Sequence, residues 1–208
     1  HRIAYLMEEK GVNPWNILAI TFTNKAASEM RERVNKIAGM GAESVWVSTF
    51  HSACVRILRR HIEVLGFGSN FTIYDAQDAL NVLKKVLKDL NIDSDLYKPK
   101  KVLSRISAYK NNLITVKAYY NNPELVEADH KANMKFIGQI YEKYVDACYR
   151  NGAMDFDDLL LKTNELLTRF PEVLAKYQDR FRYILVDEYQ DTNHSQYLIV
   201  KALSSKFE

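Results

Sequence analysis

The sequence predicts an α/β protein in which a parallel sheet with covering helices is interrupted by an all-helical insertion. Strand-like apolar runs at 17–22 and 44–50 are each followed by an amphipathic helical pattern, which is typical of a parallel sheet. Another apolar run, at 183–186, comes near the end of the chain. Between about residues 76 and 152 helical periodicity replaces the strand patterns. We therefore expect three segments: a first sheet-bearing part at 1–75, a helical insertion at 76–153, and a second sheet-bearing part at 154–208.

The first part begins with an amphipathic helix, and its two strand–helix pairs follow. Thr23 is the expected N-cap of a helix at 24–38, because its hydroxyl can accept a hydrogen bond from the first helical turn. The second strand precedes a helix expected from about Ser52 to Leu65. A short strand at 71–74 before Asp75, another N-cap candidate, completes this part.

The insertion and the segment after it show mainly helical patterns. One long helical segment is expected at about 128–150, and a further helix at 156–169 with Asp155 as its cap. Asp157 and Asp158 follow closely, so this carboxylate group is also a conceivable metal site. We favour the capping interpretation, because carboxylates at a helix start meet unpaired N–H groups and the positive end of the dipole.

The run Tyr183-Ile184-Leu185-Val186 ends abruptly in Asp187 and Glu188. The apolar residues predict a strand buried on both faces, with the two acids at its carboxyl end, where open α/β sheets bind their ligands. Phosphoryl transfer uses such a pair: one carboxylate holds Mg²⁺, and the other orients or deprotonates water. The alternative is that both acids only cap the following helix.

Two other strand–helix junctions carry polar side chains. Thr23, Asn24 and Lys25 open the first helix and form a candidate anion site, beside which Phe22 can stack on a nucleic-acid base. An ordinary capped helix with Phe22 in the core remains the alternative. At the second junction, Thr49, His51 and Ser52 offer neutral donors to phosphate oxygens. No ligand partner stands at zinc spacing from His51, so we do not expect zinc.

Three sequence motifs resemble those of UvrD/PcrA/Rep-type superfamily-one DNA helicases, and the PcrA branch most of all. Thr-Phe-Thr-Asn-Lys-Ala-Ala at 21–27 resembles motif Ia, the stretch at 47–52 motif Ib, and the stretch at 184–192 motif II, or Walker B. The resemblance extends over essentially the whole chain. It implies a RecA-like (P-loop NTPase) domain 1A interrupted by a helical domain 1B.

The resemblance also implies residue roles in an ATP- and Mg²⁺-dependent enzyme that translocates 3′ to 5′ on DNA. Asp187 would hold Mg²⁺, Glu188 would activate the hydrolytic water, and Gln190 and Asp191 would couple the nucleotide site to the motor. Single-stranded DNA would contact residues at both polar junctions: Phe22, Thr23, Asn24, Thr49 and His51. The implied partners are single-stranded DNA, single-strand/duplex junctions, and the remaining segments of the same helicase.

The 208 residues contain no G-x-x-x-x-G-K-[ST] sequence, so a Walker A loop is expected outside them and no turnover is expected from them alone. We accordingly expect a fragment of a longer protein. Two alternatives stay open: a non-catalytic single-strand-binding or adaptor module, and the helicase part of a helicase–nuclease. The lysines of the insertion could contact duplex phosphates or form a solvated surface; they are Lys84, Lys85, Lys88, Lys98, Lys100 and Lys101.

Composition narrows the class of protein further. The hydrophobic content of 47% indicates a globular chain, and the net charge of +3 means that any nucleic-acid site must be local rather than global. Cys54 and Cys148 lie in helical patterns and are expected to be buried thiols. No apolar run is long enough for a membrane span and no leader is evident, so we expect no membrane partner and a bacterial cytoplasmic location.

Overall fold

The computed structural model describes residues 1–207 and divides the chain into two compact units. Unit 1 combines residues 1–61 with the segment from Lys162 onward, and unit 2 comprises residues 62–161. The changes between units therefore lie at 61/62 and 161/162, whereas the sequence patterns change at about 75/76 and 153/154. The predicted α/β class with a helix-rich insertion is confirmed.

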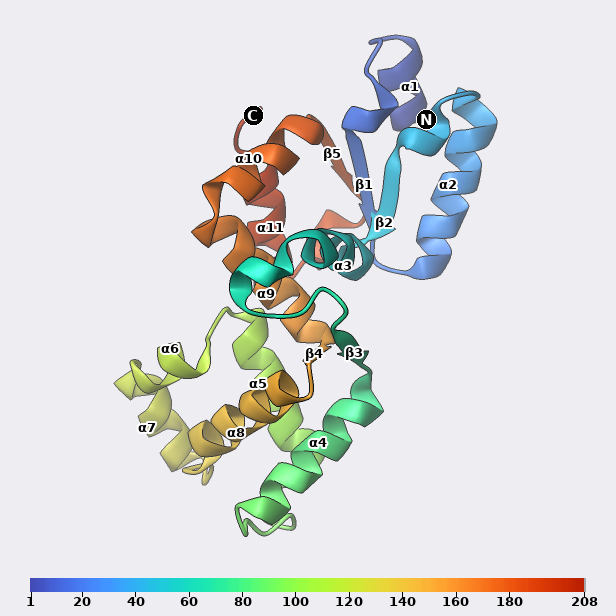
Figure 1. Ribbon diagram of the computed structural model, residues 1–208. Helices are drawn as coiled ribbons and strands as arrows, with labels where there is room; N and C mark the ends of the chain where they lie inside the picture. The colour runs from blue at the N-terminus through green and yellow to red at the C-terminus, as the bar shows by residue number, and fades with distance from the viewer. Residues whose placement is uncertain (208) are drawn as a thin grey trace. The chain divides into compact units, whose positions relative to one another are not determined.

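Unit 1 is built on a three-stranded parallel sheet (Figure 1). The strands are β1 (Ile17–Thr21), β2 (Trp46–Thr49) and β5 (Tyr183–Val186), in the order β2-β1-β5. Every residue of β1 is buried, which explains its uninterrupted apolar sequence. The helices of this unit are α1 (Arg2–Glu8), α2 (Asn24–Ala38), α3 (Phe50–His61), α10 (Pro171–Arg180) and α11 (His194–Ser204), with 3₁₀ turns at Pro14–Asn16, Ala42–Ser44 and Tyr189–Asp191.

The expectation that the strand at 183–186 is buried on both faces is wrong for the chain as described. Tyr183 is 42% exposed and the other three residues of β5 are half-buried. Among the described strands, β5 pairs only with β1 and lies at the edge of the sheet. An apolar run does not distinguish a central strand from an edge strand, because burial depends on the neighbouring strands.

Unit 2 consists mainly of helices (Figure 1), which pack around a hydrophobic core of their own. Its helices are α4 (Ala76–Asp89), α5 (Pro99–Asn111), α6 (Val116–Tyr120), α7 (Pro123–Lys131), α8 (Ile137–Arg150) and the start of α9 (Phe156–Arg169), after a 3₁₀ turn at Ile62–Leu65. The core is rich in tyrosine: Tyr109 stacks on Tyr141 with ring centroids 5.7 Å apart. The six lysines for which duplex contact and a solvated surface were the alternatives are all exposed.

Two features of unit 2 differ from the sequence-based expectations. The expected strand at 71–74 exists as β3 (Thr72–Tyr74), but its parallel partner β4 (Ala153–Asp155) was not expected, because three residues are too few for a periodic signal. The prediction of a single helical segment at about 128–150 is wrong. The chain leaves the helix after Lys131 and resumes it at Ile137, with Asn133 in the left-handed region at φ 59°.

Asp155 and Asp158 form the expected cap of α9, with reciprocal side-chain to backbone hydrogen bonds. Asp155 Oδ1 accepts from the Asp158 N–H at 2.9 Å, and Asp158 Oδ2 accepts from the Asp155 N–H at 3.1 Å. The buried Lys110 of α5 lies between them, with Nζ 2.8 Å from Asp155 Oδ2 and 2.9 Å from Asp158 Oδ1. The Tyr144 hydroxyl donates to the same Asp155 oxygen at 2.8 Å. A buried ion-pair cluster therefore fixes the first turn of α9.

The three charges of this cluster perturb one another's pKa values. Burial alone would lower the pKa of Lys110, but the carboxylates of Asp158 and Asp155 outweigh it and raise the pKa. Burial raises the pKa of Asp158 to about 6, although Lys110 opposes the shift. Asp155 is also buried, yet its contacts with Lys110 lower its pKa. The lysine is therefore held in its charged form by the two carboxylates.

Both cysteines are buried and free, as expected. Burial raises the pKa of the Cys54 and Cys148 thiols to about 12, which disfavours the reactive thiolate. Within residues 1–207, no helix combines the length and apolar character needed to cross a membrane.

Replacing Lys110 with methionine leaves Asp155 and Asp158 buried without their cation. We expect Lys110→Met to lower the free energy of unfolding by about 3–5 kcal/mol, as measured by urea denaturation. Lys101→Met, on the exposed face of the same helix, is the control and should change it by less than about 0.5 kcal/mol. Equal effects of the two substitutions would contradict the role of Lys110.

Candidate functional site

The parallel register brings the carboxyl ends of the three strands of unit 1 to one edge of the sheet. Thr21 of β1 is paired with Thr49 of β2, and Ile20 of β1 with Val186 of β5. The Asp187 N–H continues the ladder by donating to the Ile20 carbonyl at 2.9 Å. The residues expected to contact the nucleotide and single-stranded DNA lie at these strand ends or follow them closely, so one edge of the sheet brings them together.

Asp187 and Glu188 leave the end of β5 and do not belong to an α-helix. Both are exposed, and Glu188 has φ 52° and ψ 47°, in the left-handed region. This conformation is uncommon for a residue with a side chain and costs on the order of 1–3 kcal/mol, so it persists only where the surrounding structure imposes it. Strained backbone of this kind clusters at functional sites.

The residues after the acid pair show that the pair does not cap the next helix. Gln190 and Asp191 lie exposed in a 3₁₀ turn, where the Asp191 N–H donates to the Glu188 carbonyl at 2.9 Å. The cap of α11 is Asn193, whose Oδ1 accepts from the Gln196 N–H at 2.9 Å while Gln196 Oε1 accepts from the Asn193 N–H at 3.0 Å. The capping alternative for Asp187 and Glu188 is therefore wrong.

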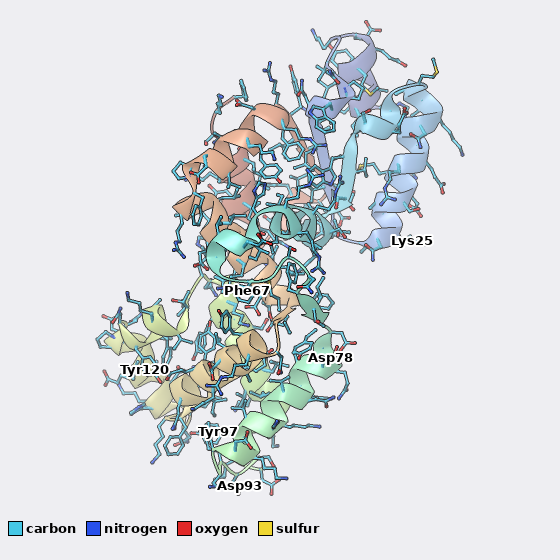
Figure 2. The ribbon with its side chains drawn as sticks, viewed as in Figure 1. Lys25, Phe67, Asp78, Asp93, Tyr97 and Tyr120 are labelled. Atoms are coloured by element: carbon cyan, nitrogen blue, oxygen red, sulfur yellow. The ribbon has the colours of Figure 1, made fainter. Side chains whose placement is uncertain are left out.

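The first polar junction is an ordinary capped helix start with exposed side chains around it. Thr23 Oγ1 accepts from the Ala26 N–H at 3.1 Å, which confirms it as the N-cap of α2. Thr23, Asn24 and Lys25 are all exposed. Figure 2 shows Lys25 at the N-terminal end of α2. These groups are therefore accessible to an anion at the carboxyl edge.

Phe22 is half-buried, so it is neither a core residue nor a free surface ring. Its ring packs against that of Phe50, with centroids 5.5 Å apart and planes tilted by 52°. Phe50 is only 2% exposed and opens α3. The buried ring thus supports Phe22 from below while part of the Phe22 surface remains accessible.

Thr49 is buried, and its Oγ1 accepts from the Ser52 N–H at 3.2 Å. Its hydroxyl therefore caps the first turn of α3 in addition to any contact with a ligand. His51 lies half-buried in that same turn. α3 begins at Phe50, two residues earlier than expected, because β2 ends at Thr49.

Unit 2 contains a pocket that the sequence did not indicate. Its volume is about 560 Å³, and aromatic and polar side chains line it, among them Tyr74, Gln77, Lys100, Ser104 and Phe156. Phe156 is 48% exposed although it opens the buried helix α9. Burial raises the pKa of Asp157 beside it, against opposing hydrogen bonds from Ser107 and Asn111. The only sequence signal for this pocket was an aromatic residue beside each of two capping aspartates, Tyr74 before Asp75 and Phe156 after Asp155.

The carboxylates at the carboxyl edge suit an Mg²⁺ ion that binds one or two protein ligands better than a metal ion enclosed by protein ligands alone. Among residues 1–207, no three or more His, Cys, Asp or Glu side chains converge on one point. Mg²⁺ in nucleotide sites takes one or two carboxylates, and phosphate and water complete its octahedron. The exposed Asp187 carboxylate at a strand end fits that requirement.

The chain matches the family model of the UvrD/REP helicase N-terminal domain over residues 1–208. It is 49% identical to the ATP-dependent DNA helicase PcrA of Bacillus subtilis, covering 100% of this chain and 27% of that protein. It is 51% identical to the PcrA of Staphylococcus aureus and 50% identical to that of Staphylococcus epidermidis, in each case over 100% of this chain and 28% of the relative.

The chain spans little more than a quarter of the length of these curated relatives. The match nevertheless extends over the whole chain, through both compact units. On this evidence the chain belongs to the UvrD/REP helicase N-terminal domain family.

Proposed function

We propose that this chain is part of an ATP-dependent DNA helicase and supplies one wall of its nucleotide site together with part of its single-strand track. The observation that carries the proposal is the acid pair at the carboxyl edge, which emerges beside the polar ends of β1 and β2. The relatives that match the chain are named ATP-dependent DNA helicases. These names include both ATP and DNA, which agrees with a nucleotide site and a single-strand track at one edge.

The two acids take different roles in this proposal. Asp187 holds the magnesium ion of Mg-ATP, which neutralises charge on the phosphates. Glu188, whose backbone is left-handed and whose side chain caps no helix, accepts a proton from the attacking water. Gln190 and Asp191, in the 3₁₀ turn directly after the pair, transmit the state of the nucleotide to neighbouring segments.

Single-stranded DNA contacts the same edge from the other strand ends. Thr23 and Asn24 offer polar groups at the N-terminus of α2, where backbone N–H groups favour a phosphate. Phe22 provides a stacking surface, and Thr49 and His51 approach the backbone from β2 and α3. Unit 2 contributes its own aromatic pocket, in which Phe156 offers an exposed face to a base.

The complete cycle needs segments beyond this chain. The resemblance to the helicase family supports a Walker A loop and a second RecA-like domain as the partners that close the nucleotide site. It also supports 3′ to 5′ movement and action at single-strand/duplex junctions. Residues 1–208 contain no phosphate-binding G-x-x-x-x-G-K-[ST] loop, so we propose that they do not turn over ATP alone.

The general-base role is tested by Glu188→Gln in the intact protein. Loss of a general base lowers the rate of the chemical step by about 10²- to 10⁴-fold, so we expect DNA-stimulated ATPase activity to fall by that factor while DNA binding persists. Glu29→Gln, an exposed glutamate on α2, is the matched control and should be neutral. ATPase activity near the unchanged rate in Glu188→Gln would remove Glu188 from this role.

The stacking role is tested by Phe22→Ala in the intact protein. Loss of one base–aromatic contact costs about 1–3 kcal/mol, so affinity for single-stranded DNA should fall by about 5- to 150-fold, as measured by fluorescence anisotropy. Lys25→Ala should have a smaller effect. Phe22→Leu preserves the packing on Phe50 but removes the ring, and it should resemble Phe22→Ala. Affinity unchanged in both Phe22 variants would exclude the residue from the track.

A further inference from the structure

A cluster of arginines and tryptophans occupies the opposite, amino edge of the sheet in unit 1. Trp15 precedes β1, Trp46 begins β2, and Arg180 ends α10 just before β5. Arg56 and Arg60 project from α3. We call these five residues the amino-edge cluster. We propose that it binds the phosphodiester backbone of DNA at a second site, separate from the carboxyl edge.

Two of the three guanidinium groups of the cluster, those of Arg56 and Arg180, are stacked on indole rings. Arg180 Cζ lies 3.5 Å from the ring centroid of Trp15 and 4.7 Å from that of Trp46. Arg56 Cζ lies 3.8 Å from the Trp46 centroid. Stacking holds a guanidinium plane in place, while its N–H donors remain directed along the plane. Such a plane is pre-oriented for two-point contact with phosphate oxygens.

The cluster concentrates positive charge. Burial lowers the pKa of Arg180, and the charges of Arg56 and Arg60 lower it further; burial and Arg60 do the same to Arg56. The pKa of the neighbouring His61 is lowered by burial, then by Lys176 and Arg60. Within residues 1–207, none of the cluster arginines forms an ion pair with a carboxylate. An anion would therefore relieve repulsion that this part of the chain leaves uncompensated.

Two buried donors in the cluster lack a hydrogen-bond acceptor. They are Trp46 Nε1 and Arg180 Nε, the only such side-chain atoms in the described part of the chain. Trp46 is only 3% exposed, so its N–H is shielded from bulk water. An unsatisfied buried donor is costly, and native proteins nearly always satisfy it with a protein, water or ligand oxygen. These two donors show that the cluster holds no acceptor of its own, and the exposed guanidinium groups of Arg56 and Arg60 are the ones that an outside phosphate can reach.

The choice of DNA as the source of the phosphate rests on the proposed function, because DNA is the polyanion on which the helicase acts. Several arginines with Lys176 near them form a local basic surface in a chain whose net charge is only +3. A local basic surface on a nearly neutral chain is typical of backbone contact with nucleic acid. The amino edge lies at the other ends of the strands from Thr23, Thr49 and Asp187, so contact there extends the DNA path beyond the carboxyl edge.

The test measures how the affinity of the intact protein for DNA depends on salt, without nucleotide, using a labelled single strand and a labelled duplex. Each lost phosphate contact reduces the slope of log affinity against log salt by about 0.7 for a single strand and about 0.9 for a duplex. Arg56→Gln combined with Arg60→Gln should therefore reduce it by about 1.4 or about 1.8. The arm that shows the reduction identifies which form of DNA reaches the cluster.

The control removes the same charge elsewhere: Arg31→Gln with Arg33→Gln, two exposed arginines of α2, should leave the slope unchanged. Arg56→Lys with Arg60→Lys keeps the charge and should retain most of the slope, which separates lost contacts from misfolding. An unchanged slope in both arms with the glutamine pair overturns this site alone. Equal reductions in the control pair also overturn it. Failure of the intact protein to bind DNA overturns both this site and the proposed function.

Discussion

The backbone ladder of β1 is the constraint on which the carboxyl edge depends. β1 pairs in parallel with β2 on one side and with β5 on the other, and its hydrogen bonds fix both registers. Residues far apart in the chain therefore emerge at the same edge: Thr49 lies 27 positions after Phe22, and Asp187 lies 165 positions after it. A shift of one residue in either pairing would turn every side chain to the opposite face and separate these groups.

The chain divides capping and chemistry between different residues. Thr23, Thr49 and Asn193 hold the helix starts around the edge with their own side chains. Asp187 and Glu188 are not needed for that purpose, and Glu188 adopts a left-handed conformation that brings no capping hydrogen bond from its side chain. Only the Glu188 backbone has a local role, through its carbonyl, which accepts from the Asp191 N–H; strained backbone of this kind clusters at functional sites.

Unit 2 shows how a buried charge can organise a surface. Lys110 joins the two carboxylates that cap α9, and the two residues between them in sequence, Phe156 and Asp157, line the pocket. The cap interpretation of Asp155 and Asp158 was correct but incomplete. Lys110 lies in an ordinary helical pattern, 45 residues before Asp155, and no local pattern indicates that it is buried against that carboxylate.

The sequence by itself determined the α/β class, most of the helices and strands, and the acid pair at the end of a strand, because these depend on local periodicity and hydrogen bonding. It also determined the capping residues Thr23 and Asp75, whose side chains accept from the N–H groups of Ala26 and Asp78. Most of these helices and strands begin and end within a few residues of the expected positions. Only the tertiary structure decided the edge position of β5, the pairing of β3 with β4, the buried contacts of Lys110 and the arginine–tryptophan stack. Each joins residues far apart in the chain, and the energy of such a contact depends on neighbours that no local pattern specifies.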